Sequence, residues 1–207
     1  RWRIPAQFLA SAFVVYCLGD VPAIDFGLFI FSESILLNVL AVFALVWLLN
    51  LYNFMDGIDG IAATELIVVN LVSLIIVINS DSALTLIFAS FSAAAGGFLL
   101  WNWAPAKIFM ADVGSSFIGF TLGVMALLSL HHGSMTIWTW VLLLGVFIVD
   151  ATLTLLVRYR SKQRWHEGHA SHAYQNAARH YKSHAKVTIT VVLINLFWLG
   201  PLAWLSM

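Results

Sequence analysis

The sequence predicts an all-α polytopic membrane protein with about seven transmembrane helices in these 207 residues. Three observations support this class. The chain is 61% hydrophobic and only 10% charged, with a mean hydropathy of +0.92, whereas soluble domains carry roughly 25% charged residues. Apolar runs near the length of about 20 residues that a bilayer-crossing helix needs recur along the chain. The basic residues lie in alternate connections between these runs.

We expect spans at about 4–19, 35–52, 61–80, 83–101, 114–131, 136–157 and 187–207. Each should be helical, because backbone groups in lipid must be satisfied within the segment. Between the first two spans, the glycines and proline of Gly19–Gly27 are typical of turns, and a small hairpin can form there.

The distribution of charge predicts the orientation of these spans. All 10 Lys and Arg residues lie on one side, in or beside 53–60, 102–113, 158–186 and the N-terminal Arg1 and Arg3. The positive-inside rule assigns that side to the cytoplasm. The other side carries Asp20, Asp25, Glu33, Asp81, His131 and His132. A pI of about 7.2 gives no indication of a nucleic-acid partner, and the single cysteine, Cys17, rules out a disulfide framework.

The first polar stretch has a regular spacing. Asn50, Asn53, Asp56 and Asp59 follow one another at every third residue, which keeps side chains on one slowly drifting face of a helix. Two glycines at positions 57 and 60 let the backbone unwind and approach a ligand. The stretch therefore predicts a site for a cation or a phosphate, with a simple polar loop between two helices as the alternative.

The second polar stretch surrounds Asp112. Pro105 should end the preceding helix, and Asp112 comes just before Gly114 and Ser115, which open the next span. Small hydroxyl residues and free N–H groups at a helix start can cradle a phosphate, and a carboxylate beside such a cradle suits Mg²⁺. The alternative for Asp112 is a helix N-cap. Phe109 either stacks on a base or anchors the chain at the interface.

Two further features lie near the cytoplasmic side. Asp150 is about two turns inside the sixth span, where it is either functional or a structural partner of an Arg or Lys. His166, His169 and His172 stand three residues apart beside basic residues. That spacing does not fit a zinc protease helix, which needs two histidines four apart, and it favours phosphate binding. The alternative is a solvated basic loop near anionic lipid.

These three stretches resemble the polyprenyl-phosphate N-acetylhexosamine-1-phosphate transferases. The resemblance is carried by Asn50-x-x-Asn53-x-x-Asp56-Gly-x-Asp59-Gly, Phe109-Met-Ala-Asp112-x-Gly-Ser and His169-Ala-Ser-His172. Ala111 stands where the family usually has glycine, and the third motif is most similar to the bacterial O-antigen branch. The family implies that a UDP-N-acetylhexosamine donates its sugar 1-phosphate to undecaprenyl phosphate and that UMP is released. It also implies a multi-pass protein of the bacterial inner membrane, with catalytic loops on the cytoplasmic face.

The resemblance also implies a role for each matching residue. Mg²⁺, or Mn²⁺ in its place, would be held by Asp112 with support from Asn53. The residues implied as catalytic are Asp56, Asp59, Asp112, His169 and His172, the histidines as phosphate-binding groups. Those implied as substrate-binding are Asn50, Asn53, Asn102, Phe109, Gly114 and Ser115, with Asn102 and Phe109 at the uridine.

One departure qualifies this interpretation. The family has an adjacent Asp-Asp pair in an earlier cytoplasmic loop, and this chain contains none. We therefore expect residues 1–207 to form a single membrane domain that lacks about three N-terminal spans and is inactive alone. A non-catalytic membrane subunit and a lipid-linked transporter are the competing hypotheses, and UMP release separates them from the enzyme. The motifs do not select the sugar, and the apolar first and last spans are candidates for a homodimer face.

Overall fold

In the part of the chain that the structure describes, the fold is helical apart from one small hairpin, as the sequence predicts. A computed structural model describes residues 2–161 and 172–207. The helices are α1 (Arg3–Leu18), α2 (Ser34–Met55), α3 (Ile61–Val77), α4 (Ser82–Asn102), α5 (Ala111–His131), α6 (Ile137–Leu143), α7 (Gly145–Arg160), α8 (Ala173–Tyr181), α9 (His184–Ile194) and α10 (Gly200–Leu205). A π-helical segment, η1 (Asn195–Leu199), joins α9 to α10. The strands β1 (Ile24–Asp25) and β2 (Ile30–Phe31) pair antiparallel and form the expected hairpin.

The prediction of seven membrane spans is not confirmed. Among the described residues, α2, α4, α5 and the continuous segment His184–Leu205 are long and apolar enough to cross a membrane. The pair α6–α7 would be a fifth span if it is counted as one. The helices α1 and α3 are apolar but only 16 and 17 residues long, since α3 ends three residues earlier than expected. The chain is therefore a membrane protein with four or five candidate spans.

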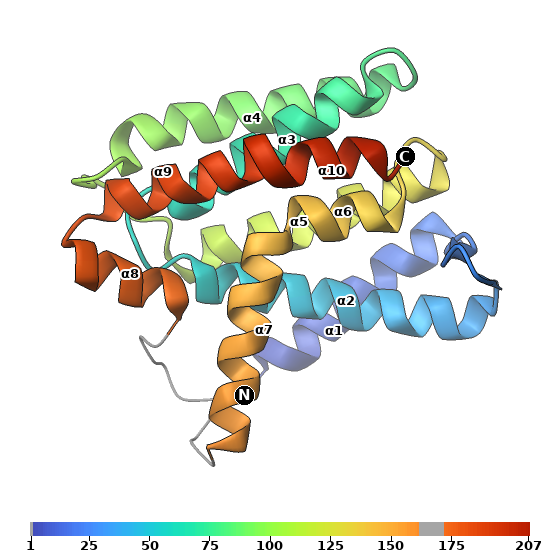
Figure 1. The fold of residues 1–207 in the computed structure, drawn as a ribbon. Coiled ribbons are helices and arrows are strands. Elements are labelled where there is room, and N and C mark those ends of the chain that lie inside the picture. Colours follow the sequence, from blue (N-terminus) through green and yellow to red (C-terminus); the bar gives the residue numbers. More distant parts are fainter. Residues whose placement is uncertain (1, 162–171) are drawn as a thin grey trace.

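The predicted span at 136–157 is broken. Leu144 leaves the helical conformation between α6 and α7, and the two helices are bent by 74°. As a result α7 runs across the other long helices (Figure 1). The residues on both sides of the break are apolar, so hydropathy alone could not indicate it. The loop expected at 158–186 is also largely helical in its described part, because α7 continues to Arg160 and α8 follows after the undescribed residues.

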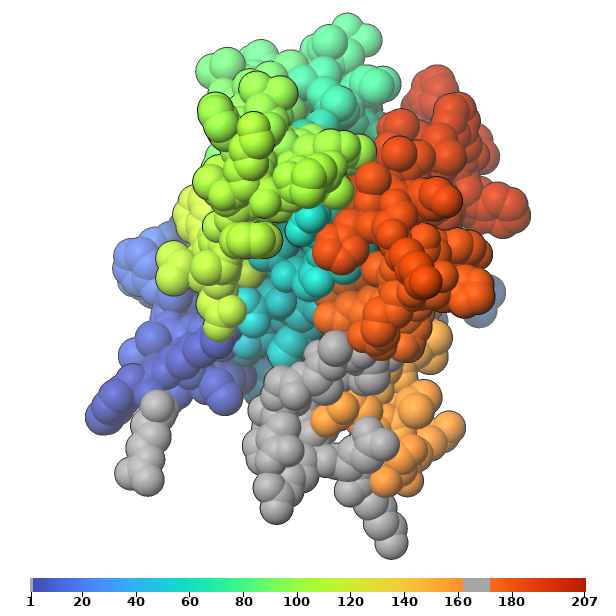
Figure 2. Space-filling view, turned by 90° about the vertical axis from the view of Figure 1, so that its left-hand side faces the viewer, coloured from blue at the N-terminus to red at the C-terminus, as the bar shows by residue number. Residues whose placement is uncertain are grey.

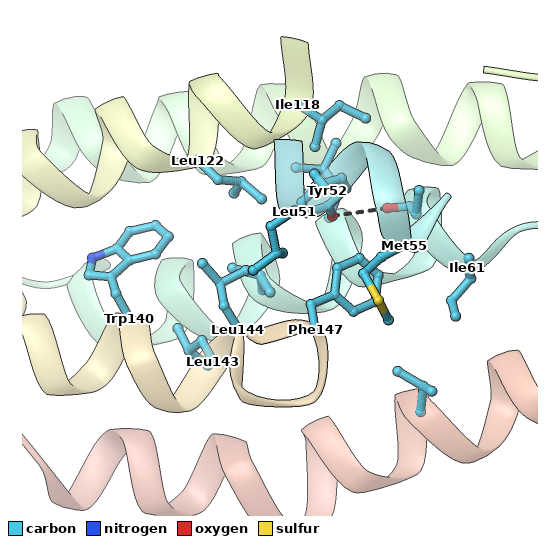
Figure 3. Packing of buried hydrophobic residues seen from close by; sticks show 14 of the residues in the cluster. Leu51, Tyr52, Met55, Ile61, Ile118, Leu122, Trp140, Leu143, Leu144 and Phe147 are labelled. Atoms are coloured by element: carbon cyan, nitrogen blue, oxygen red, sulfur yellow. Dashed lines mark hydrogen bonds between the residues drawn. The ribbon is translucent and has the colours of Figure 1, made fainter. Parts of the chain in front are cut away.

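The core lies where α2, α5, α6 and α7 meet. Tyr52, Leu122 and Phe147 are fully buried there, and Trp140 is 2% exposed (Figure 3). The Tyr52 hydroxyl donates a hydrogen bond of 3.1 Å to the Ala62 carbonyl oxygen, which links α2 to the start of α3. This packing fixes the C-terminal end of α2, and that end carries the first polar motif.

A close helix crossing holds α5 against α2. A Cβ at Gly119 would overlap the carbonyl oxygen of Leu48, and at Gly123 it would lie 2.6 Å from a methyl group of Leu45. Small residues four apart let helix backbones approach closely in membranes. The crossing brings the start of α5, with Asp112 and Ser115, beside the end of α2.

Candidate active site at one end of the helix bundle

Residues 53–60, 102–113 and 172–186 of the predicted polar loops lie at one end of the molecule, on the left in Figure 1. Figure 2 faces this end: residues 50–60 lie in the middle, between the α4–α5 connection on one side and α8 with the start of α9 on the other. A pocket of about 220 Å³ opens here. Its lining includes seven predicted site residues, Asn53, Asp56, Asp59, Asn102, Phe109, Asp112 and Ser115.

The first motif is helical only in its first half. The helix α2 continues through Asn50 and Asn53 to Met55, and the chain then unwinds into a loop that contains Asp56 and Asp59. Gly60 adopts φ +78° and leads the loop into α3, a conformation that is readily available to glycine. The spacing had predicted that the four polar side chains share one helix face. This prediction is wrong, because Asp56 and Asp59 lie in the loop that follows α2.

Asn50 is not among the residues that line the pocket. Its side-chain amide donates to Gln7 of α1 at 3.0 Å and to the Val46 carbonyl oxygen at 2.7 Å. Gln7 is 8% exposed, so this pair links α1 to α2 in the interior. Asn50 thus acts in helix packing here, and its predicted substrate contact stays a proposal.

Asp112 lies in the first turn of α5, whose N-cap is Met110. The N-cap alternative for Asp112 is therefore wrong. The Asp112 carboxylate is 72% exposed and accepts a hydrogen bond of 3.1 Å from the guanidinium of Arg3, a residue that the sequence analysis did not single out for the site. Arg3 also donates to the Ser116 hydroxyl at 3.3 Å. An ion pair this exposed contributes roughly 0–1 kcal/mol to stability. Its main effect is to place the positively charged guanidinium of Arg3 beside the Asp112 carboxylate.

The predicted phosphate cradle begins earlier than expected. Because α5 starts at Ala111, its free N–H groups belong to residues 111–114. The Ser115 hydroxyl lies 2.9 Å from the side-chain oxygen of Asn53, to which it donates, and 3.2 Å from the Ala111 carbonyl oxygen. Ser115 therefore joins α5 to α2. Gly114 is not among the pocket-lining residues, and a Cβ there would lie 2.5 Å from the side chain of Met110.

Asn102 and Phe109 line the pocket in different ways. The Asn102 side chain accepts a hydrogen bond of 3.1 Å from the Gly60 amide and donates one of 2.9 Å to the Ile108 carbonyl oxygen. Asn102 is 4% exposed, and it fastens the first motif to the α4–α5 connection. Phe109 is 74% exposed, so its ring is free to stack on a planar ligand.

The acidic pair Asp56 and Asp112 perturbs the electrostatics of the pocket. Burial, and then the negative charge of Asp112, raise the pKa of Asp56 to about 6. Both carboxylates line the 220 Å³ pocket, so a cation bound there would reduce their repulsion. Among residues 2–161 and 172–207, no three His, Cys, Asp or Glu side chains gather into a metal-binding group. Mg²⁺ is usually bound by one or two carboxylates together with water and substrate phosphates, and these residues fit that pattern.

Within residues 2–161 and 172–207, Asp150 pairs with a histidine, and not with the Arg or Lys that the sequence suggested. Its carboxylate accepts hydrogen bonds from the ring of His172 at 3.1 Å and from the amides of Ala173 and Tyr174 at 3.0 and 2.9 Å. Asp150 of α7 thus caps the N-terminus of α8. His172 is 2% exposed and is packed between these helices, outside the pocket lining. The other two predicted histidines, His166 and His169, lie outside the described residues.

The helix α8 is docked on the backbone of the first motif. The Tyr174 hydroxyl donates to the Phe54 carbonyl oxygen at 2.9 Å. A Cβ at Gly57 would overlap that hydroxyl and would lie 2.6 Å from the side-chain nitrogen of Gln175. Burial, and then the negative charges of Asp150 and Asp56, raise the pKa of Tyr174 well above its usual value, so the hydroxyl keeps its proton and remains a donor.

A second feature that the sequence analysis missed is an apolar cleft beside α7. It has a volume of about 990 Å³ and is lined by α7, α8 and the segment from α9 to η1. Val149, Leu153 and Val191 are among its apolar residues, and Asp150 and Lys186 also reach it. No local sequence signal indicates the cleft, because the 74° bend before α7 creates one of its walls.

The helices and the pocket together define an α-helical membrane protein with an acidic, amide-rich site at one end. The chain belongs to glycosyl transferase family 4, whose family model matches residues 1–130. This confirms the resemblance to the polyprenyl-phosphate N-acetylhexosamine-1-phosphate transferases.

Named relatives agree with this assignment. The chain is 32% identical to a probable undecaprenyl-phosphate N-acetylglucosaminyl 1-phosphate transferase of Bacillus subtilis. The aligned 164 residues cover 77% of the chain and 45% of that protein. The chain is 30% identical over 165 residues to a phospho-N-acetylmuramoyl-pentapeptide-transferase of Wolbachia sp., which covers 77% of the chain and 48% of the relative. A Streptococcus thermophilus protein of the same name is 30% identical over 176 residues, with 81% and 50% covered. The chain spans about half the length of these relatives.

Proposed function

We propose that the protein containing this chain transfers a sugar 1-phosphate from a UDP-N-acetylhexosamine to undecaprenyl phosphate. An oxygen of the lipid phosphate attacks the phosphorus next to the sugar, the bond to UMP breaks, and UMP leaves as a lipid-linked diphosphate sugar forms. The observation that carries the proposal is the pocket in which Asp56, Asp59 and Asp112 meet at one end of an apolar bundle. Membership of the transferase family supports the same reaction.

Each pocket residue has a proposed task. Asp112, with Asn53 behind it, holds Mg²⁺, which when bound supplies charge neutralisation for the donor diphosphate. Asp56 and Asp59 are active-site acids beside the nucleotide and the ion. The exposed ring of Phe109 stacks on the uracil, and Asn102 supports that side of the pocket. His169 and His172 are proposed to bind phosphate, which for His172 requires the ring to leave its buried contact with Asp150.

The apolar cleft suits the other substrate. A lipid phosphate must bring a long apolar chain to a polar site, and the cleft runs along α7 to Asp150 and Tyr174 at the base of α8. Tyr174 in turn contacts the backbone of the first motif. We propose that the polyprenyl chain lies in this cleft with its phosphate directed to the pocket. The side with Lys107, Arg179 and Lys182 then faces the cytoplasm, as the positive-inside rule requires.

The test uses the complete protein that carries this chain, assayed in membranes. UMP release would be measured with undecaprenyl phosphate, a panel of UDP-N-acetylhexosamines, and either Mg²⁺ or EDTA. We expect UMP with at least one donor, only when both the lipid and the divalent ion are present, and loss of UMP in Asp112→Asn. UMP release without the lipid, or no UMP with any donor, would reject the proposal and favour a non-catalytic subunit or a transporter.

A further inference from the structure

One face of α9 is polar, although it packs against the apolar bundle. His184 and Thr188 of α9 and Asn195, the first residue of η1, lie four and seven residues apart, a spacing that keeps them near one face of the continuous helical segment. Thr188 is fully buried and Asn195 is 1% exposed. We call these three residues the α9 polar face. A buried polar side chain is costly unless it has a partner, and each of these has one.

All three partners belong to the first motif or to the helix that follows it. The Asp59 amide donates to the Nδ1 atom of His184 at 3.3 Å, and the Thr188 hydroxyl donates to the Asp59 carbonyl oxygen at 3.2 Å. Further along the face, the Asn195 amide donates to the carboxyl group of Glu65 in α3. The α9 polar face therefore follows the chain from Asp59 into α3 and fixes α9 in one rotational setting.

The contact of His184 is with the side chain of Asp59 as well as with its backbone. The Nδ1 atom lies 3.3 Å from Asp59 Oδ2, and that same oxygen accepts a hydrogen bond of 3.1 Å from the Ala106 amide. One ring nitrogen either accepts the Asp59 N–H or donates to the carboxylate, according to where the ring carries its proton. In both cases the group it holds is Asp59.

We propose that His184 is a positioning residue that, with Thr188, sets the orientation of Asp59 in the site. The inference rests on the proposed function, because that function makes Asp59 an active-site acid. The sequence alone suggests that His184 is a surface charge near lipid head groups. The structure differs: His184 and Asp59 both line a second pocket, of about 650 Å³, and Asp59 lines the 220 Å³ pocket as well. Asp59 therefore contacts His184 in the second pocket and also lines the 220 Å³ pocket of the candidate active site.

The chemistry of histidine allows a sharp pair of variants. The Nδ1 atom lies as far from the backbone as the amide group of asparagine, whereas the amide of glutamine reaches to the position of Nε2. His184→Asn therefore keeps a hydrogen-bonding group against Asp59, and His184→Gln carries the same kind of group past it. His180 of α8 is exposed and stacks edge-on with Tyr181, so His180→Gln is the matched control.

The kinetic experiment uses the complete protein and measures UMP release. We expect His184→Gln to lower kcat about tenfold, as the loss of a hydrogen bond to a charged group allows, with the donor KM within about twofold of the wild type. His184→Asn should restore kcat to within about threefold, and His180→Gln should change neither constant. The inference is overturned if Asn and Gln are equally impaired, if neither is impaired, or if only KM rises.

A second measurement does not depend on activity. Thermal unfolding of the detergent-solubilised protein would be compared for Asp59→Ala, His184→Gln and the double variant. We expect the two shifts in Tm to be non-additive by about 2 °C or more, whereas Asp59→Ala and His180→Gln should add. Additive shifts for His184 and Asp59 would overturn the inference. If the wild type releases no UMP with any donor, the proposed function fails, and this cycle still decides whether His184 holds Asp59.

Discussion

The crossing of α5 on α2 makes a prediction that can be worked out from distances. A Cβ at Gly119 would overlap the Leu48 carbonyl oxygen and would lie 2.7 Å from the Cβ of Tyr52. Carbon atoms in contact normally lie about 3.5–4.0 Å apart. The obstacle in Gly119→Ala is backbone, which no rotamer change can move away. The two helices would have to separate by about 1 Å, since that is the shortfall in contact distance.

The expected loss of stability follows from two opposing effects. Overpacking of this kind costs about 1–3 kcal/mol, while alanine gains up to about 1 kcal/mol over glycine in a helix. Gly119→Ala should therefore lower the Tm of the detergent-solubilised protein by about 2–8 °C. Its UMP release should also fall, because separation of the helices pulls Ser115 away from Asn53.

Two other glycines calibrate this result. A Cβ at Gly96 of α4 meets nothing within 4 Å, so Gly96→Ala should be neutral or stabilising. At Gly123 the nearest atom is the end of the flexible Leu45 side chain, and Gly123→Ala should be intermediate. Thermal unfolding of the three variants in one detergent gives the order. A Gly119→Ala protein as stable as Gly96→Ala would refute the close crossing.

Three further predictions concern acidic residues. In EDTA, Asp56→Asn should raise stability by at most about 3 kcal/mol, because the raised pKa of Asp56 makes its ionisation destabilising. That gain should be small below about pH 4, grow as the pH rises through about 6, and shrink when Mg²⁺ is added to the unfolding assay. Hydrogen bonds from the Leu84 amide and then His132 lower the pKa of Asp81. Asp81→Asn should therefore lower Tm at neutral pH and have no effect once acid has protonated the wild type, whereas a pH-independent shift would contradict this. Asp150→Ala should cost about 1–3 kcal/mol, since it removes the acceptor of the Ala173 and Tyr174 amides at the start of α8; Asp150→Asn should cost less, and equal Tm values for both would argue against the cap.

Much of the pocket could be predicted because its residues occur in short local motifs. Asp56, Asp59 and Asp112 are polar groups next to apolar spans, where they are expensive unless they are used. The alternation of basic loops then predicted that the motifs meet on one side. The pocket brings these acids together with Asn102 and Phe109. This grouping could be predicted even though some of the predicted helix boundaries differ from the observed ones.

The residues that were missed act through long-range contacts. Arg3 and Asp112 are 109 residues apart, and Asp59 and His184 are 125 apart. In isolation, Arg3 and His184 each look like an ordinary basic residue at a membrane surface. What distinguishes them is the helix face they occupy after packing, and that depends on the setting of α1 against α5 and of α9 against α3.

The count of seven spans was not confirmed for a different reason. Hydropathy measures how apolar a run is, and the run at 136–157 is apolar on both sides of Leu144. The bend depends on the conformation of one residue and on what packs against α7, so composition carries no signal of it. The same bend forms the cleft beside α7, and the cleft could not be predicted for that reason either.

The contact between Tyr174 and the first motif has a consequence for how such a protein diversifies. Tyr174 donates to a carbonyl oxygen and lies against a glycine that has no side chain. A side chain that docks on main-chain atoms has no partner whose identity can change in step with it. Across many sequences, this junction should therefore leave a fixed glycine and a fixed aromatic hydroxyl, and methods that infer contacts from correlated substitutions should fail to detect it. Engineered chimeras that exchange α8 should therefore keep Tyr174 and the glycine against which it lies.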